Sequence, residues 1–111
     1  KDRLIHSVLP YALVNGTKVA DNWTDLVDGT LDAPISVSEL NTNVFAYVYT
    51  ATTATGDANG NDCVNWTSTL ITGPGSFFMQ GYTGFADQTW TTNSTVNGCG
   101  VVQNHLYCLE Q

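Results

Sequence analysis

The sequence predicts a single α+β domain, residues 1–111, with several short strands, long polar loops and one short helix. Charged residues make up only 12% of the chain, about half of the usual ~25%, and Thr, Asn, Gly and Ser take their place. The apolar residues fall in short runs rich in β-branched and aromatic types, which are typical of strands. One stretch carries the start and stop signals of a helix. This combination favours a secreted protein of strands and loops over a helical cytosolic enzyme.

A hairpin is predicted near the N-terminus. Residues 3–9 fit either one helical turn or a short strand, and Pro10 ends that segment. Residues 11–20 contain two short apolar runs on either side of Asn15-Gly16, a residue pair that strongly favours a two-residue hairpin turn. The two runs are therefore expected to pair as antiparallel strands.

The helix is predicted within residues 21–29. Asp21 or Asn22 provides an N-cap side chain, and Gly29 is a suitable stop. The following stretch, residues 33–40, alternates weakly between apolar and polar side chains and predicts a short strand.

The clearest strand of the sequence is residues 43–52, which are rich in β-branched and aromatic side chains. One face carries Val44, Ala46 and Val48, and the other carries Phe45, Tyr47 and Tyr49. Because both faces are apolar, we expect a central strand that is covered on both sides.

Turns and short strands alternate in the second half of the chain. The pattern predicts loops at 54–62 and 72–76, strands at 63–68 and 105–111, an apolar run at 77–85 and a polar stretch at 86–100 anchored by Trp90. Loops of this length are unusual in a compact domain unless they are functional or covalently held.

The charge distribution excludes several partners. Ten acidic and three basic residues give a net charge of −7, and the bases are Lys1, Arg3 and Lys18. Residues 19–111 therefore contain no Lys or Arg, whereas phosphate recognition needs clusters of them. We expect no binding to nucleic acid, to heparin-like polyanions or to anionic membranes. No apolar run of 18 residues is present, so membrane insertion is not expected either.

The three cysteines, Cys63, Cys99 and Cys108, indicate one disulfide and one remaining thiol in an oxidising compartment. No C-x-x-C pair is present; the alternative is three reduced, buried thiols in a cytosolic protein. If Cys63 pairs with Cys99, the bridge closes a loop of about 36 residues. Loop entropy then gives roughly 3.8 kcal/mol of stabilisation.

Three segments occur in an order and spacing that resemble a known family. They are KDRLIHSVLPY followed by GTKVADNWTDLVDG, then NVFAYVYTATTATGDANGNDCVNWTS, and finally GCGVVQNHLYCLEQ. Together they cover nearly the whole chain and resemble the endostatin-like branch of the C-type-lectin-like fold, as found in the leptospiral endostatin-like outer-membrane proteins. That resemblance implies a mixed, mainly antiparallel twisted sheet with long disulfide-stapled loops.

The resemblance also assigns the cysteines. It implies a Cys63–Cys99 disulfide, and it pairs Cys108 with a cysteine in an N-terminal helix outside this chain. The chain then corresponds to the C-terminal two-thirds of such a domain, in a bacterial cell-surface protein that is anchored to the outer membrane through its N-terminal region. The missing N-terminal fragment is one expected partner, and a second copy of the chain is another.

A calcium site is one candidate. Asp57, Asn59, Asn61 and Asp62 place several carboxylate and amide oxygens in one turn-rich loop, and calcium takes six to eight oxygen ligands. Ser68 occupies the position where an EF-hand loop has its Glu, and the usual lectin triplets are absent. The alternative is a polar turn held by Asx hydrogen bonds, with no cofactor.

Aromatic residues in the loop-rich half are the second candidate site. Tyr82, Phe85 and Trp90 are suitable anchors for a protein or glycan ligand, or else they are core residues. Trp66 follows a cysteine in a predicted strand and is expected in the core.

The sequence carries no sign of catalysis. It has no G-x-S-x-G, no H-E-x-x-H and no P-loop, and His6 and His105 lie about a hundred residues apart. We therefore expect no enzyme. The favoured function, which follows from the resemblance, is an extracellular recognition or adhesion module that binds host or matrix proteins. The alternatives are a calcium-dependent carbohydrate-binding module and a structural subunit of an extracellular filament or sheath.

Overall fold

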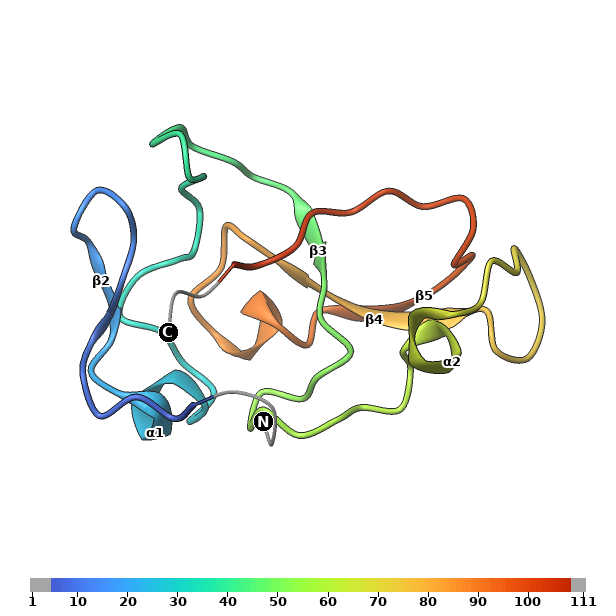
Figure 1. Cartoon of the computed structure of the whole chain (residues 1–111), viewed down its shortest axis with the longest axis horizontal. Helices are drawn as coiled ribbons and strands as arrows, with labels where there is room; N and C mark the ends of the chain where they lie inside the picture. The colour runs from blue at the N-terminus through green and yellow to red at the C-terminus, as the bar shows by residue number, and fades with distance from the viewer. Residues whose placement is uncertain (1–4, 109–111) are drawn as a thin grey trace.

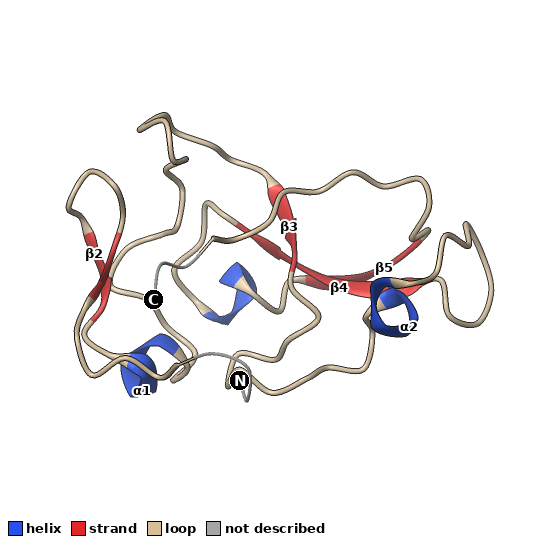
Figure 2. Cartoon of the chain, in the orientation of Figure 1, coloured by secondary structure: helices blue, strands red, loops and turns tan. Residues whose placement is uncertain are grey.

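A computed structural model of the chain describes residues 5–108 and shows an α+β arrangement with two antiparallel sheets (Figures 1 and 2). A two-stranded hairpin lies beside a three-stranded sheet of order β3-β4-β5. In chain order the elements are β1 (Tyr11–Ala12), β2 (Lys18–Ala20), α1 (Trp23–Leu26), β3 (Tyr47–Tyr49), α2 (Cys63–Trp66), β4 (Phe77–Tyr82), η1 (Gln88–Trp90) and β5 (Ser94–Asn97). Much of the chain between them is loop, as Figure 2 shows. Within the described residues, no helix is long and apolar enough to cross a membrane.

The N-terminal hairpin and the short helix are where the sequence predicts them. β1 pairs with β2, and the turn places Gly16 at a φ of +86°, a conformation that glycine adopts without steric cost. Asn22 caps α1, because its side-chain oxygen accepts hydrogen bonds from the backbone N–H groups of Thr24 and Asp25. This unit holds the main buried cluster, which consists of Val19, Ala20, Leu26 and Leu31.

The predicted strand at 43–52 is shorter and less central than expected. β4 is the middle strand, and β3 pairs with it on one side, while His105 forms a single parallel bridge to Val48 on the other. Val48 is completely buried, but Phe45 and Tyr47 on the opposite face are 65% and 46% exposed. The expectation that both faces are covered is therefore wrong, because apolar character on a strand face does not by itself supply a second packing layer.

The predicted strand at 63–68 is wrong. α2 is a single left-handed turn, since the φ angles of Cys63, Val64, Asn65 and Trp66 all lie between +54° and +61°. The Asp62 side chain accepts a hydrogen bond from the Asn65 backbone N–H and so caps the turn. This conformation is unfavourable for residues with a Cβ, so tertiary contacts must impose it.

The other two predicted strands, at 33–40 and 105–111, form only isolated β-bridges within the described residues. Residues 33–40 contribute only a bridge between Val37 and Asn43, and the closing segment contributes the bridge at His105. Residues 109–111 of the predicted final strand lie outside the described residues. In contrast, β5 forms within the stretch that the sequence marks as polar, because it pairs with β4 along four residue pairs.

Candidate recognition surface

Four aromatic side chains form one exposed surface at the end of β3 and β4, which we call the aromatic face: Phe45, Tyr47, Tyr82 and Phe85. Tyr47 and Tyr82 are directly paired across the two strands, and their ring centroids lie 5.1 Å apart. The Tyr82 and Phe85 ring centroids are also 5.1 Å apart. Phe45 precedes Tyr47 by two residues and so lies on the same side of the chain.

Gly84 has no side chain, and this leaves room for the Tyr82 and Phe45 rings to lie against its backbone. A Cβ on Gly84 would lie 2.8 Å from the Tyr82 ring and 3.2 Å from the Phe45 ring, so both rings lie against this glycine. Exposed fractions of 65% for Phe45, 46% for Tyr47 and 45% for Phe85 leave much of the surface open to solvent. Contiguous exposed apolar surface of this kind marks interaction sites more often than scattered residues do.

Thr83 fixes the backbone beneath the aromatic face. Its backbone N–H donates to the Ala46 carbonyl, and the Ala46 N–H donates to the Thr83 hydroxyl. The same hydroxyl donates to the Val44 carbonyl at 2.6 Å. Because Thr83 is 4% exposed, these bonds are shielded from water and hold the two aromatic segments in register.

The structure brings together two of the three predicted ligand-binding aromatics. Tyr82 and Phe85 belong to the aromatic face, whereas Trp90 packs against the hairpin core and against Tyr107, at a centroid distance of 5.5 Å. Burial raises the pKa of Tyr107, whose hydroxyl donates to the Trp90 carbonyl. Among the described residues, the Trp90 indole Nε1 is the buried side-chain atom without a hydrogen-bond partner.

Sequence reasoning missed the contributions of Phe45 and Tyr47 to this surface. It placed both residues on one strand face but assigned that face to the interior. The sequence does contain a signal for this surface. Phe45 and Tyr47 are two residues apart, so their side chains lie on the same face of an extended strand. Thr83 gave no signal, because its role depends on backbone groups 37 and 39 residues away.

The predicted calcium ligands take part in separate local arrangements. Asp57 accepts a hydrogen bond from the Thr55 hydroxyl within a turn, and Asn61 donates to the Asn59 side chain. Asp62 caps the left-handed turn. Among the described residues, no three His, Cys, Asp or Glu side chains are grouped closely enough to hold a metal ion.

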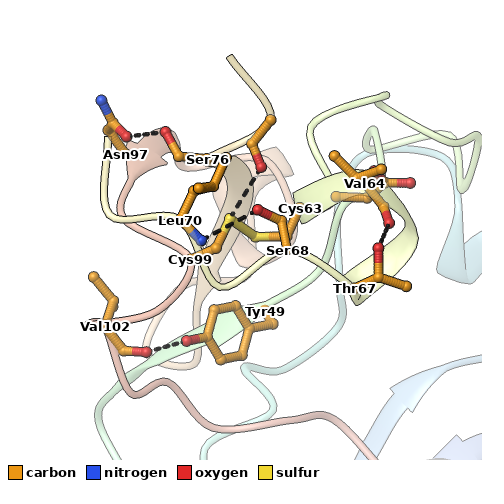
Figure 3. The surroundings of a disulfide bond; sticks show 12 residues. Tyr49, Cys63, Val64, Thr67, Ser68, Leu70, Ser76, Asn97, Cys99 and Val102 are labelled. Atoms are coloured by element: carbon orange, nitrogen blue, oxygen red, sulfur yellow. Dashed lines mark hydrogen bonds between the residues drawn. A yellow bond between two sulfur atoms is a disulfide. The ribbon is translucent and has the colours of Figure 1, made fainter. Parts of the chain in front are cut away.

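The predicted disulfide is confirmed at the other end of the sheet, where Cys63 and Cys99 are bonded with a Cα–Cα distance of 5.9 Å (Figure 3). The bridge joins the left-handed turn to the loop after β5. Figure 3 also shows the Tyr49 hydroxyl donating to the Val102 carbonyl, which fixes that loop against β3. The disulfide therefore organises the loop end of the molecule.

This loop end also exposes apolar side chains. Trp66 is 51% exposed and makes an edge contact with Tyr49, so the prediction that Trp66 is a core residue is wrong. The left-handed turn gives the reason, because Cys63 is buried in the disulfide while the next three residues, 64–66, are exposed. The exposed neighbours at this end are Val64, Leu70, Ile71, Phe77 and Val101.

A groove of about 750 Å³ lies between the hairpin and the inner face of the sheet. Its apolar lining includes Leu13, Val19, Ile35, Val44, Val48 and Leu106. Cys108, which is exposed and has a free thiol, lies at the same groove. Cys108 thus forms no disulfide within the described residues and lies beside an apolar surface.

The two histidines lie in different surroundings. The His6 ring stacks on Trp23 at a centroid distance of 4.1 Å, and the His105 backbone pairs with β3.

No protein-family model matches the chain, and no curated protein or solved structure matches it either. The geometry of the described residues is therefore the basis on which a function is proposed.

Proposed function

We propose that this protein is a non-enzymatic, extracellular recognition module that binds a protein ligand through its aromatic face. The observation that supports the proposal is the cluster of three exposed rings, Phe45, Tyr47 and Phe85, around the half-buried Tyr82 on a hydrogen-bonded backbone. Tyr and other aromatic side chains are enriched at the energetic centres of protein interfaces. Because Thr83 holds the backbone in place, the rings need little ordering on binding, which lowers the entropic cost of association.

The extracellular location is supported by the Cys63–Cys99 bridge, since disulfides persist mainly in oxidising compartments. The resemblance to endostatin-like surface proteins gives the ligand class, namely host matrix or plasma proteins. A bacterial cell-surface adhesion module is thus the role that we propose.

The proposal includes a covalent partner for Cys108. The resemblance assigns it to a cysteine in an N-terminal helix, and the groove beside Cys108 supports this assignment because it offers apolar surface to such a helix. Peptide mapping by mass spectrometry of the protein purified from its source and digested without reductant tests this pairing. The expected result is a Cys108 peptide joined by a disulfide to a peptide from outside residues 1–111; a free Cys108 thiol, or Cys108 joined to a second Cys108, would contradict it.

The aromatic face is tested by binding to a panel of purified extracellular-matrix and plasma proteins. Replacing Phe85 with Ser should weaken binding at least fivefold, because it removes an exposed ring from the face. Phe77→Ser is the matched control, since Phe77 is 41% exposed, compared with 45% for Phe85, and lies at the other end of β4. Equal losses in both variants, or full binding by Phe85→Ser, would overturn the proposal.

A further inference from the structure

Among the described residues, Lys18 is the one Lys or Arg side chain, and it is paired with Asp21 and Asp32. The sequence has no Lys or Arg from residue 19 to residue 111. Within the described part of the chain, Lys18 is held by carboxylates of Asp21 at 2.6 Å and Asp32 at 2.8 Å. The hydrogen bonds that the Lys18 ammonium donates to the two carboxylates raise the pKa of Lys18, so its charge is kept at the hairpin.

One carboxylate follows the aromatic face closely in the sequence. Asp87 follows Phe85 by two residues, is exposed, and accepts hydrogen bonds from the Thr89 hydroxyl and backbone N–H. These bonds lower the pKa of Asp87 and keep it ionised.

The contacts between the rings determine where a ligand group can bind. The Tyr47 and Tyr82 planes meet at 64°, and the Tyr82 and Phe85 planes meet at 47°. With centroids 5.1 Å apart in both pairs, the rings pack against one another, so a ligand group meets their solvent-exposed faces rather than the space between them. A guanidinium or ammonium group is attracted to such faces by the ring quadrupole.

We infer that the aromatic face binds a basic segment of its protein partner, with Arg or Lys side chains placed against the solvent-exposed faces of the Tyr47, Tyr82 and Phe85 rings. This inference rests on the proposed function and names the partner chemistry. The net charge of −7 adds long-range attraction for a cationic segment, and salt weakens that attraction. Asp87 supplies the nearest fixed negative charge in the sequence to Phe85.

The probe is a capped hexa-arginine peptide, with a capped hexa-glutamate peptide as the charge control, titrated by calorimetry at 50 mM and 300 mM salt. Hexa-arginine should bind and weaken at least fivefold with the added salt, while hexa-glutamate should not bind. Tyr82→Ser should weaken hexa-arginine binding about fivefold, and Tyr82→Phe should preserve it because the ring remains. Phe77→Ser should leave it unchanged.

A second pair of variants tests whether hexa-arginine binding depends on the charge next to the aromatic face or only on the net charge of the protein. Asp87→Asn and Asp57→Asn each remove one negative charge, and only Asp87 lies beside the aromatic face in sequence. Asp87→Asn should weaken hexa-arginine binding more than Asp57→Asn does. Equal effects of the pair, or unchanged binding by Tyr82→Ser, would show attraction by net charge alone and would overturn the inference. If Phe85→Ser abolishes matrix-protein binding while hexa-arginine neither binds nor competes, the inference fails and the proposed function stands.

Discussion

Removing the Cys63–Cys99 bridge is the perturbation whose effect on stability follows most directly from the structure. The bridge closes a loop with a sequence separation of 36, for which loop entropy gives a stabilisation of about 3.8 kcal/mol. A domain of this size has a total stability of about 5–15 kcal/mol, so the loss is a large fraction of it. Partial relaxation of the left-handed turn, which the Asp62 cap still holds, offsets about 1 kcal/mol of the loss. We therefore expect a net destabilisation of about 3 kcal/mol.

Urea unfolding followed by tryptophan fluorescence measures this loss. In a chain of residues 1–111 alone, the double variant Cys63→Ala/Cys99→Ala is compared with a Cys108→Ala control, which leaves the Cys63–Cys99 bridge intact. With a urea m-value of about 2 kcal/mol/M, the expected shift of the midpoint is about 1–2 M. A shift below about 0.3 M would refute the reasoning, because it would mean that the bridge neither restricts the unfolded chain nor holds the loop end together.

Three further predictions concern the sheet and the loops. Thr83→Val keeps the shape of the side chain but removes two shielded hydrogen bonds, and it should lower the free energy of unfolding by about 1–3 kcal/mol in the same urea assay. A smaller loss than for the exposed control Thr55→Val would contradict the role of Thr83. Gly81→Ala would place a Cβ 1.9 Å from the Trp90 carbonyl oxygen, so it should abolish cooperative unfolding, whereas Gly60→Ala has open space and should not. Because Asp57 and Asp62 serve separate turns, millimolar calcium should leave the melting temperature within about 1 °C; a rise of several degrees would restore the calcium-dependent module.

Local signals in the sequence predicted the N-terminal unit well. The Asn15-Gly16 pair marks the position of the hairpin turn, although the loop has three residues, 14–16, because Leu13 pairs with Thr17. Asn22 caps the helix through backbone groups two and three residues away. Such interactions are complete within a short segment, so the sequence pattern is sufficient to place them.

The left-handed turn at 63–66 was not predictable in the same way. Val64 favours a strand by its branching, and the φ of +56° that it adopts is imposed by the cap and by a disulfide to Cys99. β5 was missed for a related reason: Ser94 and Thr95 look like loop residues, and only pairing with β4 makes them a strand.

The candidate site was half predictable. Tyr82 and Phe85 were selected as exposed anchors, and alternation along 43–52 correctly grouped Phe45 with Tyr47. Alternation assigns residues to a face, but whether a second layer covers that face depends on the rest of the fold. Trp90 is the opposite case. Its large aromatic side chain predicts an exposed anchor for a ligand, but in the structure it packs against the hairpin core.

Cross-saturation NMR tests the central claim most directly, because it reports which side chains touch the ligand. The protein is labelled on its aromatic rings and bound to the unlabelled member of the matrix-protein panel that binds most tightly. Saturation transfer is predicted at the rings of Phe45, Tyr47, Tyr82 and Phe85, with little at Trp66 and Phe77. Transfer confined to Trp66 and Phe77 would place recognition at the disulfide end and contradict the account.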